Sequence, residues 1–449
     1  MRIARGVAQA RDTVLRRVSL EAPELPAAVR GEIRRVFGVE LDAEGVVDRI
    51  LRDVREEGDA AVLRYNEDVD GIHGDLSLSL EVSQQEVQAA YSQVEPSLVD
   101  ALRDAADRIR SFHQQQLDFS LRSFDEGGIG QMVRPLRRVG VYVPGAKVAY
   151  PSTVLMTVIP ARVASVSEII MATPALEDAT VSPVKLVAAD IAGVDRIFRA
   201  GGVQGVAAMA YGTETIPKVD KICGPGNIFV TLAKKRLHGE VGIDGLFGPS
   251  ETLVIAAGDA DPALLAADLL AGAEHDEMAT AVLITLSEEL AREVVAEVEV
   301  QLKKLERAPV AGASLAAHGG VAVVASLEEA VALANEFAPE HLCLHGKEAE
   351  KLLEHIRNAG CVFMGAASAE SIGDYIVGPS HVLPTGGSAA YASALGVHDF
   401  LKVSSLVALT GEAVDEIGPA AAAIARAEGF TAHARAIERR LKRGQAWET

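Results

Sequence analysis

The feature that most constrains the fold is a repeated alternation of short apolar runs with longer helical segments. It begins at Val139–Val143 and continues to about Ser250. Further apolar runs in this stretch are Ile169–Ala172, Leu186–Ala189 and Val219–Ile222. A second series starts at Thr252–Ala256 and ends in a helical pattern over Leu327–Phe337. Strands that alternate with helices in this way build parallel, doubly wound sheets.

The pattern predicts an α/β fold with two doubly wound, incomplete Rossmann-like parallel-sheet domains and with helical N- and C-terminal extensions. We expect the first α/β domain to be discontinuous and the second to be inserted within it. The expected segments are an N-terminal helical arm over 1–36, a first domain over 37–140 and 250–395, a second domain over 141–249 and a C-terminal helical tail over 396–449. A cleft between two such sheets is a common substrate site.

Composition restricts the possible partners of the chain. Its 449 residues include 63 acidic and 43 basic side chains, and the net charge of -20 repels phosphate backbones, so we expect no nucleic-acid binding. No run approaches the roughly 20 apolar residues of a membrane helix, and we expect no membrane attachment. The cysteines are Cys223, Cys343 and Cys361, without a CxxC pair. Free thiols are therefore expected, as in a cytoplasmic protein.

One glycine-rich turn is a candidate phosphate site. The chain has neither the GxGxxG fingerprint after a strand nor the GxxxxGK[ST] motif. The segment Cys223–Asn227 instead follows an expected strand and leads into a helical run. Glycines at such a turn let a ligand approach the backbone, and a helix N-terminus favours a phosphate. The same residues also suit a tight turn capped by Asn227.

The pair Glu340–His341 is the candidate for proton transfer. It follows Pro339, which ends a helical segment, so the pair falls at the end of an element. An imidazole accepts a proton near neutral pH, and an adjacent carboxylate can activate water. A surface acid beside a half-buried histidine is the alternative. The other metal-capable residues have no short metal-binding spacing; they are Glu274, His275, Asp374, His381, Glu428 and His433.

Short segments along almost the whole chain resemble, in the same order, those of the histidinol dehydrogenase family. The matching segments are Val141–Gly145, Gly201–Gln204, Lys221–Asn227, Gly248–Glu251, Ala273–His275, Ala338–Leu342, Gly373–Tyr375, His381–Thr385 and Phe430–His433. The resemblance implies NAD-dependent oxidation of L-histidinol to L-histidine through an aldehyde, with one zinc ion per subunit. It also implies a homodimer in which the partner's C-terminal tail completes each active site.

The resemblance assigns roles to individual residues. It implies that Glu340 and His341 transfer protons and that the second α/β domain holds NAD. The residues implied to bind NAD are Tyr142, Gln204 and Asn227. Those implied to bind the substrate are Ser250, His275, His341, Asp374, His381, Glu428 and His433. The implied zinc ligands are His275, Asp374 and His433.

One residue departs from the family pattern. The family has a glutamine ligand three residues before the motif histidine, where this chain has Gly272, which offers no side chain to a metal. Three hypotheses therefore stand: a histidinol dehydrogenase, a related dehydrogenase for another small polar alcohol, and a non-catalytic NAD-binding or scaffold protein. The intact Glu340–His341 pair argues against the scaffold, which needs no acid and base side by side.

Overall fold

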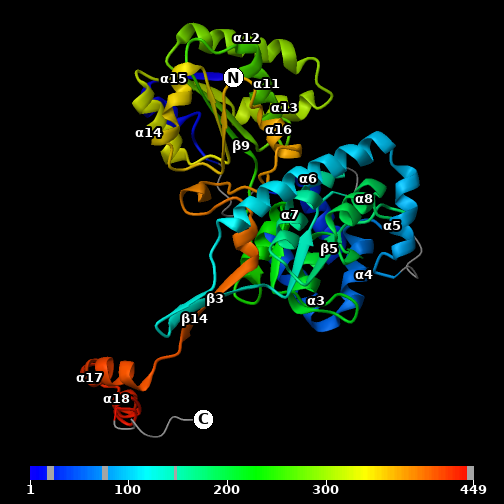
Figure 1. Cartoon of the computed structure of the whole chain (residues 1–449). Coiled ribbons are helices and arrows are strands. Elements are labelled where there is room, and N and C mark those ends of the chain that lie inside the picture. Colours follow the sequence, from blue (N-terminus) through cyan, green and yellow to red (C-terminus); the bar gives the residue numbers. More distant parts are fainter. Residues whose placement is uncertain (18–24, 73–78, 146–148, 442–449) are drawn as a thin grey trace. The chain divides into compact units, whose positions relative to one another are not determined.

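The computed structural model of the chain describes residues 1–17, 25–72, 79–145 and 149–441 (Figure 1). Its contacts define two compact units. The first unit comprises Met1–Asp118 and Leu136–Phe400, and the second comprises Phe119–Pro135 and Leu401–Thr449. Part of the predicted N-terminal arm, 18–24, and the end of the predicted tail, 442–449, lie outside the described residues.

The larger sheet of the first unit has six parallel strands in the order β1-β11-β10-β9-β12-β13. The strands are β1 (Arg2–Arg5), β9 (Glu251–Ala256), β10 (Thr280–Thr285), β11 (Gly320–Val323), β12 (His341–His345) and β13 (Cys361–Met364). Every residue of β9, β10 and β12 is buried. Such strands belong to a sheet with both faces covered, as the apolar runs predicted.

Helices cover both faces of the larger sheet. Leu253 and Ile255 of β9 pack with residues of α1 and α14, whereas Val254 and Ala256 pack with residues of α11 and α12. Side-chain caps from Asp261, Ser287 and Ser326 fix where α11, α12 and α14 begin. The helices are α1 (Gly6–Asp12), α11 (Pro262–Ala273), α12 (Glu288–Leu302), α13 (Ala308–Ala317), α14 (Leu327–Phe337), α15 (Lys347–Glu350) and α16 (Glu370–Tyr375), with short 3-10 turns at Lys351–His355, Ser388–Ala390 and Val397–Phe400.

The smaller sheet of the first unit has five parallel strands in the order β6-β5-β4-β7-β8. The strands are β4 (Arg138–Tyr142), β5 (Glu168–Thr173), β6 (Arg196–Arg199), β7 (Lys221–Cys223) and β8 (Gly242–Ile243). The helices between them are α7 (Pro151–Val163), α8 (Pro183–Ala192), α9 (Gly202–Tyr211) and α10 (Ile228–Leu237). The predicted strand at Leu186–Ala189 is wrong, because it lies inside α8. A short apolar run does not distinguish a buried helix from a buried strand.

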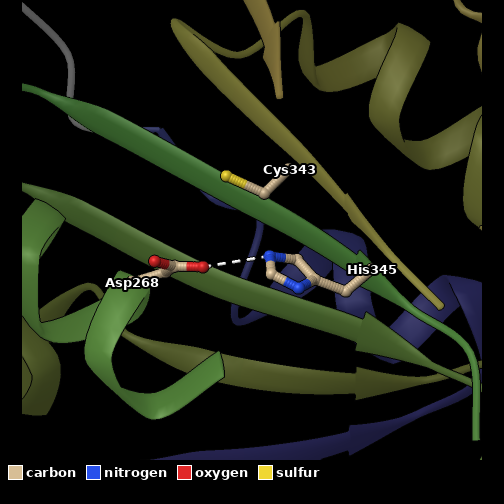
Figure 2. Close-up of side chains that lie close together, drawn as sticks. All are labelled: Asp268, Cys343 and His345. Carbon is tan, nitrogen blue, oxygen red and sulfur yellow. Dashed lines mark ion pairs between the residues drawn. The ribbon is translucent and has the colours of Figure 1, made fainter. Parts of the chain in front are cut away.

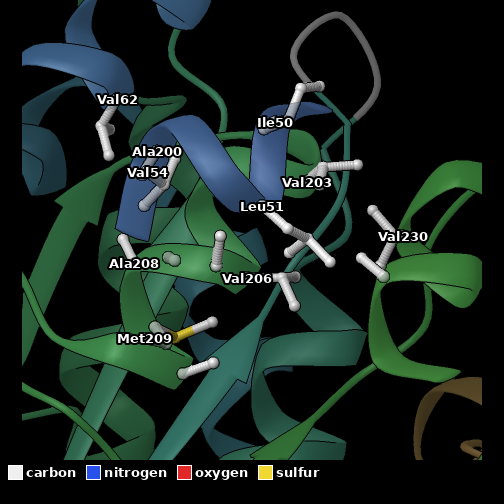
Figure 3. Close-up of a cluster of buried hydrophobic side chains, with 14 of the residues drawn as sticks. Ile50, Leu51, Val54, Val62, Ala200, Val203, Val206, Ala208, Met209 and Val230 are labelled. Carbon is white, nitrogen blue, oxygen red and sulfur yellow. The ribbon is translucent and has the colours of Figure 1, made fainter. Parts of the chain in front are cut away.

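The N-terminal helices pack on the smaller sheet. They are α2 (Ala27–Phe37), α3 (Ala43–Glu57), α4 (Asp59–Asp68), α5 (Gln84–Ala90) and α6 (Pro96–Asp118), with a 3-10 turn at Tyr91–Gln93. Ile50 and Val54 of α3 share a buried cluster with Val206 and Met209 of α9 (Figure 3). The structure therefore differs from the expected grouping of 37–140 with 250–395. Helical periodicity shows that a segment has an apolar face but not which sheet that face covers.

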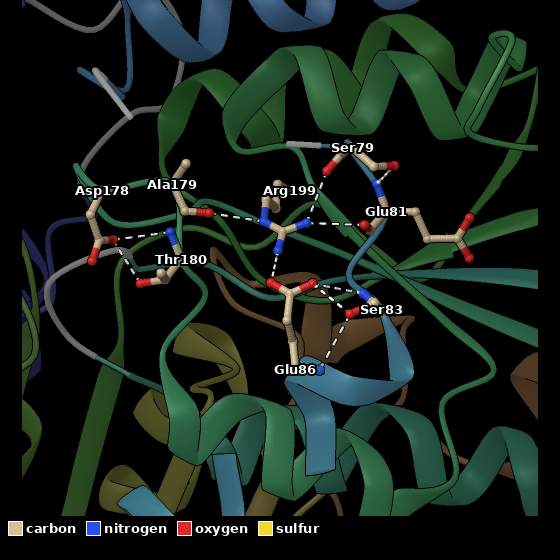
Figure 4. A network of polar contacts seen from close by, with 8 residues as sticks. All are labelled: Ser79, Glu81, Ser83, Glu86, Asp178, Ala179, Thr180 and Arg199. Carbon is tan, nitrogen blue, oxygen red and sulfur yellow. Dashed lines mark hydrogen bonds and ion pairs between the residues drawn. The ribbon is translucent and has the colours of Figure 1, made fainter. Parts of the chain in front are cut away.

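A buried arginine ties the segment around α5 to the smaller sheet. Arg199, at the end of β6, donates hydrogen bonds to the carbonyls of Ala179, Ser79 and Glu81 at 2.8, 2.9 and 3.0 Å (Figure 4). It also pairs with Glu86, which forms a capping box with Ser83 at the start of α5. A buried guanidinium is stable only when its donors are satisfied in this way.

The second unit is built from a small antiparallel sheet and two helices. Strand β3 (Ile129–Pro135) pairs with β2 (Phe124–Glu126) and with β14 (Leu401–Val407). Helices α17 (Gly411–Ala427) and α18 (Thr431–Glu438) are joined by Arg426, whose Nη2 donates to Glu438 at 2.7 Å. Two predicted helical extensions thus contain strands, β1 in the arm and β14 in the tail. Both pair with distant segments, which local periodicity does not reveal.

Candidate active site

One cavity of about 820 Å³ in the first unit contains nine of the predicted site residues. They are Tyr142, Gln204, Asn227, Ser250, His275, Glu340, His341, Asp374 and His381. Tyr142 ends β4, and Asn227 follows β7, so these residues lie at the carboxyl ends of the smaller sheet. Glu340 and His341 lie where β12 begins, at the amino edge of the larger sheet. The cavity is therefore lined by the carboxyl edge of the smaller sheet and by the amino edge of the larger sheet.

The side chains predicted to bind a dinucleotide are fixed by hydrogen bonds to backbone amides and to the carboxylate of Asp70. The Tyr142 hydroxyl accepts a hydrogen bond from the Gly202 amide at 3.0 Å, and Asn227 caps α10. Gln204 is buried and donates to Asp70 at 2.9 Å, while its Oε1 has no hydrogen-bond partner among the described residues. Burial raises the pKa of Asp70 to about 7. Sequence reasoning missed Asp70, which has no chemical motif around it.

The turn before α10 needs glycine for a steric reason. Gly224 has a φ of +112°, and a Cβ atom there would lie 2.1 Å from the carbonyl oxygen of Tyr142. Its backbone therefore approaches β4 more closely than any side chain allows. Asn227 accepts hydrogen bonds from the amides of Phe229 and Val230, both at 3.1 Å. Both interpretations of this turn, a capped helix start and a close approach to a ligand, are compatible with this geometry.

Glu340 and His341 are buried at the start of β12. Helix α14 ends at Phe337, the following Ala338 has a left-handed backbone, and the chain then enters the strand. Glu340 accepts a hydrogen bond from the Glu251 amide at 3.0 Å, and burial raises its pKa to about 8. The pair is thus inside the protein, not on the surface as the alternative interpretation required.

His341 is surrounded by carboxylates. Its Nδ1 lies 3.7 Å from Glu340 and 3.5 Å from Glu370, and its Nε2 lies 3.5 Å from Asp374. Burial lowers the pKa of His341, but Glu370, Glu340 and Asp374 together raise it to about 10. Neither ring nitrogen has a hydrogen-bond partner at normal distance among the described residues. The imidazole is therefore free to bond to a ligand in the cavity.

Three side chains have the donor atoms of a metal site. His275, Glu370 and Asp374 each offer one ligand atom, and these atoms lie within 4.8 Å of one another. An imidazole nitrogen with carboxylate oxygens suits zinc and similar divalent cations. His381 is different, since Nδ1 contacts the Asp374 carbonyl at 2.8 Å and Nε2 contacts Thr153 at 3.2 Å. Its two ring nitrogens are already engaged.

Glu370 was not predicted as a site residue. It is the first residue of α16 and is 1% exposed. Thr252 donates a hydrogen bond to its carboxylate, at 2.9 Å from Oε2. Burial raises the pKa of Glu370 to about 7. No short motif surrounds this glutamate in the sequence, and only the fold brings it beside His341.

The position of Gly272 is crowded. It lies in the last turn of α11, and a Cβ atom there would lie 2.1 Å from Thr252 Oγ1. Its φ is not positive, so the backbone itself would accept another residue. The neighbouring threonine, and not the backbone conformation, is what excludes a side chain.

A second polar cluster lies between α11 and β12. His345 Nε2 lies 3.0 Å from an oxygen of Asp268, and Cys343 lies on the same strand two residues earlier (Figure 2). All three residues are buried, and burial raises the pKa of the thiol well above its usual value. The ion pair ties α11 to β12, the two elements whose ends carry His275 and His341.

Glu428 and His433 belong to the second unit. Glu428 follows the last residue of α17, and His433 lies on α18 with its ring centroid 5.3 Å from that of Phe430. Both side chains are exposed. All the residues that line the cavity belong to the first unit.

None of the helices in the described ranges has the length and apolarity that spanning a membrane requires.

Known proteins share both the sequence and the fold of this chain. The family model described as histidinol dehydrogenase matches residues 35–441. The histidinol dehydrogenase of Moorella thermoacetica is 51% identical over 91% of this chain and 97% of its own length, and that of Dehalococcoides mccartyi is 48% identical over 98% and 100%. A crystal structure of histidinol dehydrogenase from Elizabethkingia anophelis aligns with a TM-score of 0.88 and 34% identity, covering 98% of both chains. The chain belongs to the histidinol dehydrogenase family.

Proposed function

We propose that the chain oxidises L-histidinol to L-histidine through L-histidinal, with NAD as the hydride acceptor. The observation that carries this proposal is the burial of Glu340 and His341 in the same cavity as Tyr142, Gln204 and Asn227. The volume of about 820 Å³ lies within the usual range of ligand pockets. A position at the carboxyl ends of parallel strands also suits a dinucleotide.

The reaction needs two hydride transfers and a hydration between them. In the first step a hydride passes from the alcohol carbon to NAD⁺, and His341 accepts the hydroxyl proton. Water then adds to the aldehyde, and Glu340 in its carboxylate form accepts a proton from it. A second hydride leaves the hydrated carbon for a second NAD⁺, and the carboxylic acid that results loses its proton. One alcohol and one water thus yield one carboxylate, two NADH and three protons. Holding base and acid side by side lets one site perform both oxidations.

We propose that His275 and Asp374 bind zinc, together with His433 of the partner subunit. The donor types support a divalent cation, as does the surplus of carboxylates around His341. When bound there, the cation would polarise the alcohol oxygen and lower the pKa of His341 towards the range in which imidazole accepts a proton.

The composite site implies a homodimer. Support comes from apolar side chains that are exposed in the second unit and that contact with a partner subunit would bury. They include Ile129, Val407, Ile424 and Phe430. We propose that Glu428 and His433 complete the cavity of the partner subunit. Unpaired Cys223, Cys343 and Cys361 suit a cytoplasmic enzyme.

The test is NADH production from purified protein. L-histidinol should yield two NADH per molecule oxidised, and other amino or sulfonated alcohols should yield far less. His341→Ala and Glu340→Gln should keep a normal melting profile while turnover falls by about 100-fold or more, the scale of general acid–base loss. Near-normal turnover in both variants would contradict the roles of these residues.

A second candidate is a dehydrogenase for another small polar alcohol. Gly272 supports it, because this chain has no side chain where the family has a glutamine, next to the Thr252 hydroxyl that bonds to Glu370. The same assay distinguishes the two functions. A higher kcat/KM with a sulfonated or other amino alcohol than with L-histidinol would favour the second.

A further inference from the structure

The structure places a buried acid, Glu370, beside the proposed metal site, to which Gly272 contributes no side chain. Gly272 offers no ligand atom, whereas Glu370 brings a carboxylate oxygen within 4.8 Å of ligand atoms of His275 and Asp374. We propose that Glu370 is itself a ligand of the metal in this chain and that Thr252 holds it in position. This inference rests on the proposed zinc site and adds a residue to it.

The surroundings of Glu370 favour a cation next to its carboxylate. The side chain is buried, and no lysine or arginine pairs with it in the described part of the chain. Its contacts are the Thr252 hydroxyl and, at 3.5 Å, Nδ1 of His341. His341 is its ion-pair partner, but that imidazole is shared with Glu340 and Asp374. One imidazolium does not offset three buried carboxylates, and a metal ion would supply the missing positive charge.

Thr252 couples the residue at 272 to the position of Glu370. The Thr252 hydroxyl donates to both carboxylate oxygens, at 3.1 and 2.9 Å. A Cβ atom on residue 272 would lie 2.1 Å from that hydroxyl oxygen and 2.8 Å from Thr252 Cβ. The same space therefore holds either a side chain from α11 or the hydrogen bond that fixes Glu370. With glycine in α11, the hydrogen bond forms and the carboxylate faces the cluster.

A different role for Glu370 is to orient His341 without touching the metal. Both roles affect turnover, so activity does not distinguish them. Metal binding does, because a group that only orients His341, which is not a proposed ligand, should leave zinc affinity unchanged. A lost ligand weakens zinc binding and also changes the coordination sphere. The absorption of Co²⁺ in the site reports that sphere directly.

The experiment uses the full chain after dialysis against a chelator. Zinc affinity is measured by competition with a chromophoric chelator, and Co²⁺ spectra are recorded for each variant. Glu370→Ala should weaken zinc binding by about 100-fold or more, and Thr252→Val by about 10-fold. Glu370→Gln, which keeps the shape of the side chain, should shift the Co²⁺ absorption bands. Glu340→Gln is the matched control, since Glu340 also contacts His341 but lies outside the cluster, and it should change neither readout.

Two results with the variants would overturn the inference. One is unchanged zinc affinity and Co²⁺ absorption in folded Glu370→Gln and Glu370→Ala protein, which would leave Glu370 as a group that orients His341. The other is an equal loss in Glu340→Gln, which would mean that any nearby negative charge is sufficient. If the unmodified chain oxidises L-histidinol but never retains about one metal ion, the zinc proposal itself fails, and this inference fails with it.

Discussion

At the scale of single residues, the crowding around Gly272 determines what a substitution there would do. Gly272→Ala should lower the free energy of unfolding by about 1–3 kcal/mol, the usual effect of overpacking, because the new methyl group meets Thr252. The sequence predicted the residues that have a chemical motif, such as Glu340 and His341 after Pro339. It missed Glu370 and Asp70, which enter the site only through the fold.

The matched control for this change is Gly312→Ala. Gly312 also lies inside a helix, but its nearest neighbour for a new Cβ atom is Leu302, at 3.7 Å, an ordinary contact. Alanine there should raise stability by about 0.4–1 kcal/mol, since it restricts the unfolded chain. Thermal and urea unfolding of both variants measure the difference. Stabilisation by both substitutions would show that Thr252 moves aside freely.

At the scale of elements, apolar runs predicted strands and helices that are buried on all sides, and α14 has the predicted bounds. Pairing between distant segments was not predictable, which is why β1 and β14 were missed. Strand β6 was missed as well, because it begins and ends with arginine. Arg199 in that strand also satisfies carbonyls around α5, so Arg199→Ala should destabilise this region by about 1–3 kcal/mol, the cost of leaving buried acceptors without a donor.

Hydrogen exchange locates that effect. Amides of α5 should exchange faster in Arg199→Ala than in the unmodified chain, while amides of β10 in the other sheet should keep their protection. Arg110→Ala provides the control, because the pair of Arg110 with Asp107 is exposed and such pairs contribute at most about 1 kcal/mol. Equal protection of α5 in both variants would mean that the helix is held by its apolar contacts alone.

At the scale of the whole molecule, the sequence predicted two parallel sheets but not how the N-terminal helices are shared between them. Helix α3 has an apolar face in the sequence, yet only the packed core shows that this face covers α9. The role of the second unit is likewise a matter of assembly. Contact of this unit with a second copy of the chain would explain both why its apolar residues are exposed and why His433 is exposed, because His433 would then enter the active site of that copy.

Subunit exchange tests that assembly. Chains carrying His341→Ala and chains carrying His433→Ala should each be inactive alone. After random exchange, the mixture should recover about a quarter of the wild-type activity, because half of the dimers are mixed and each mixed dimer has one site without a lesion. Light scattering verifies the dimer, and differently tagged chains verify the exchange. If exchange is complete and activity stays absent, His433 acts within its own chain, since in that arrangement every site keeps one lesion whichever subunits associate.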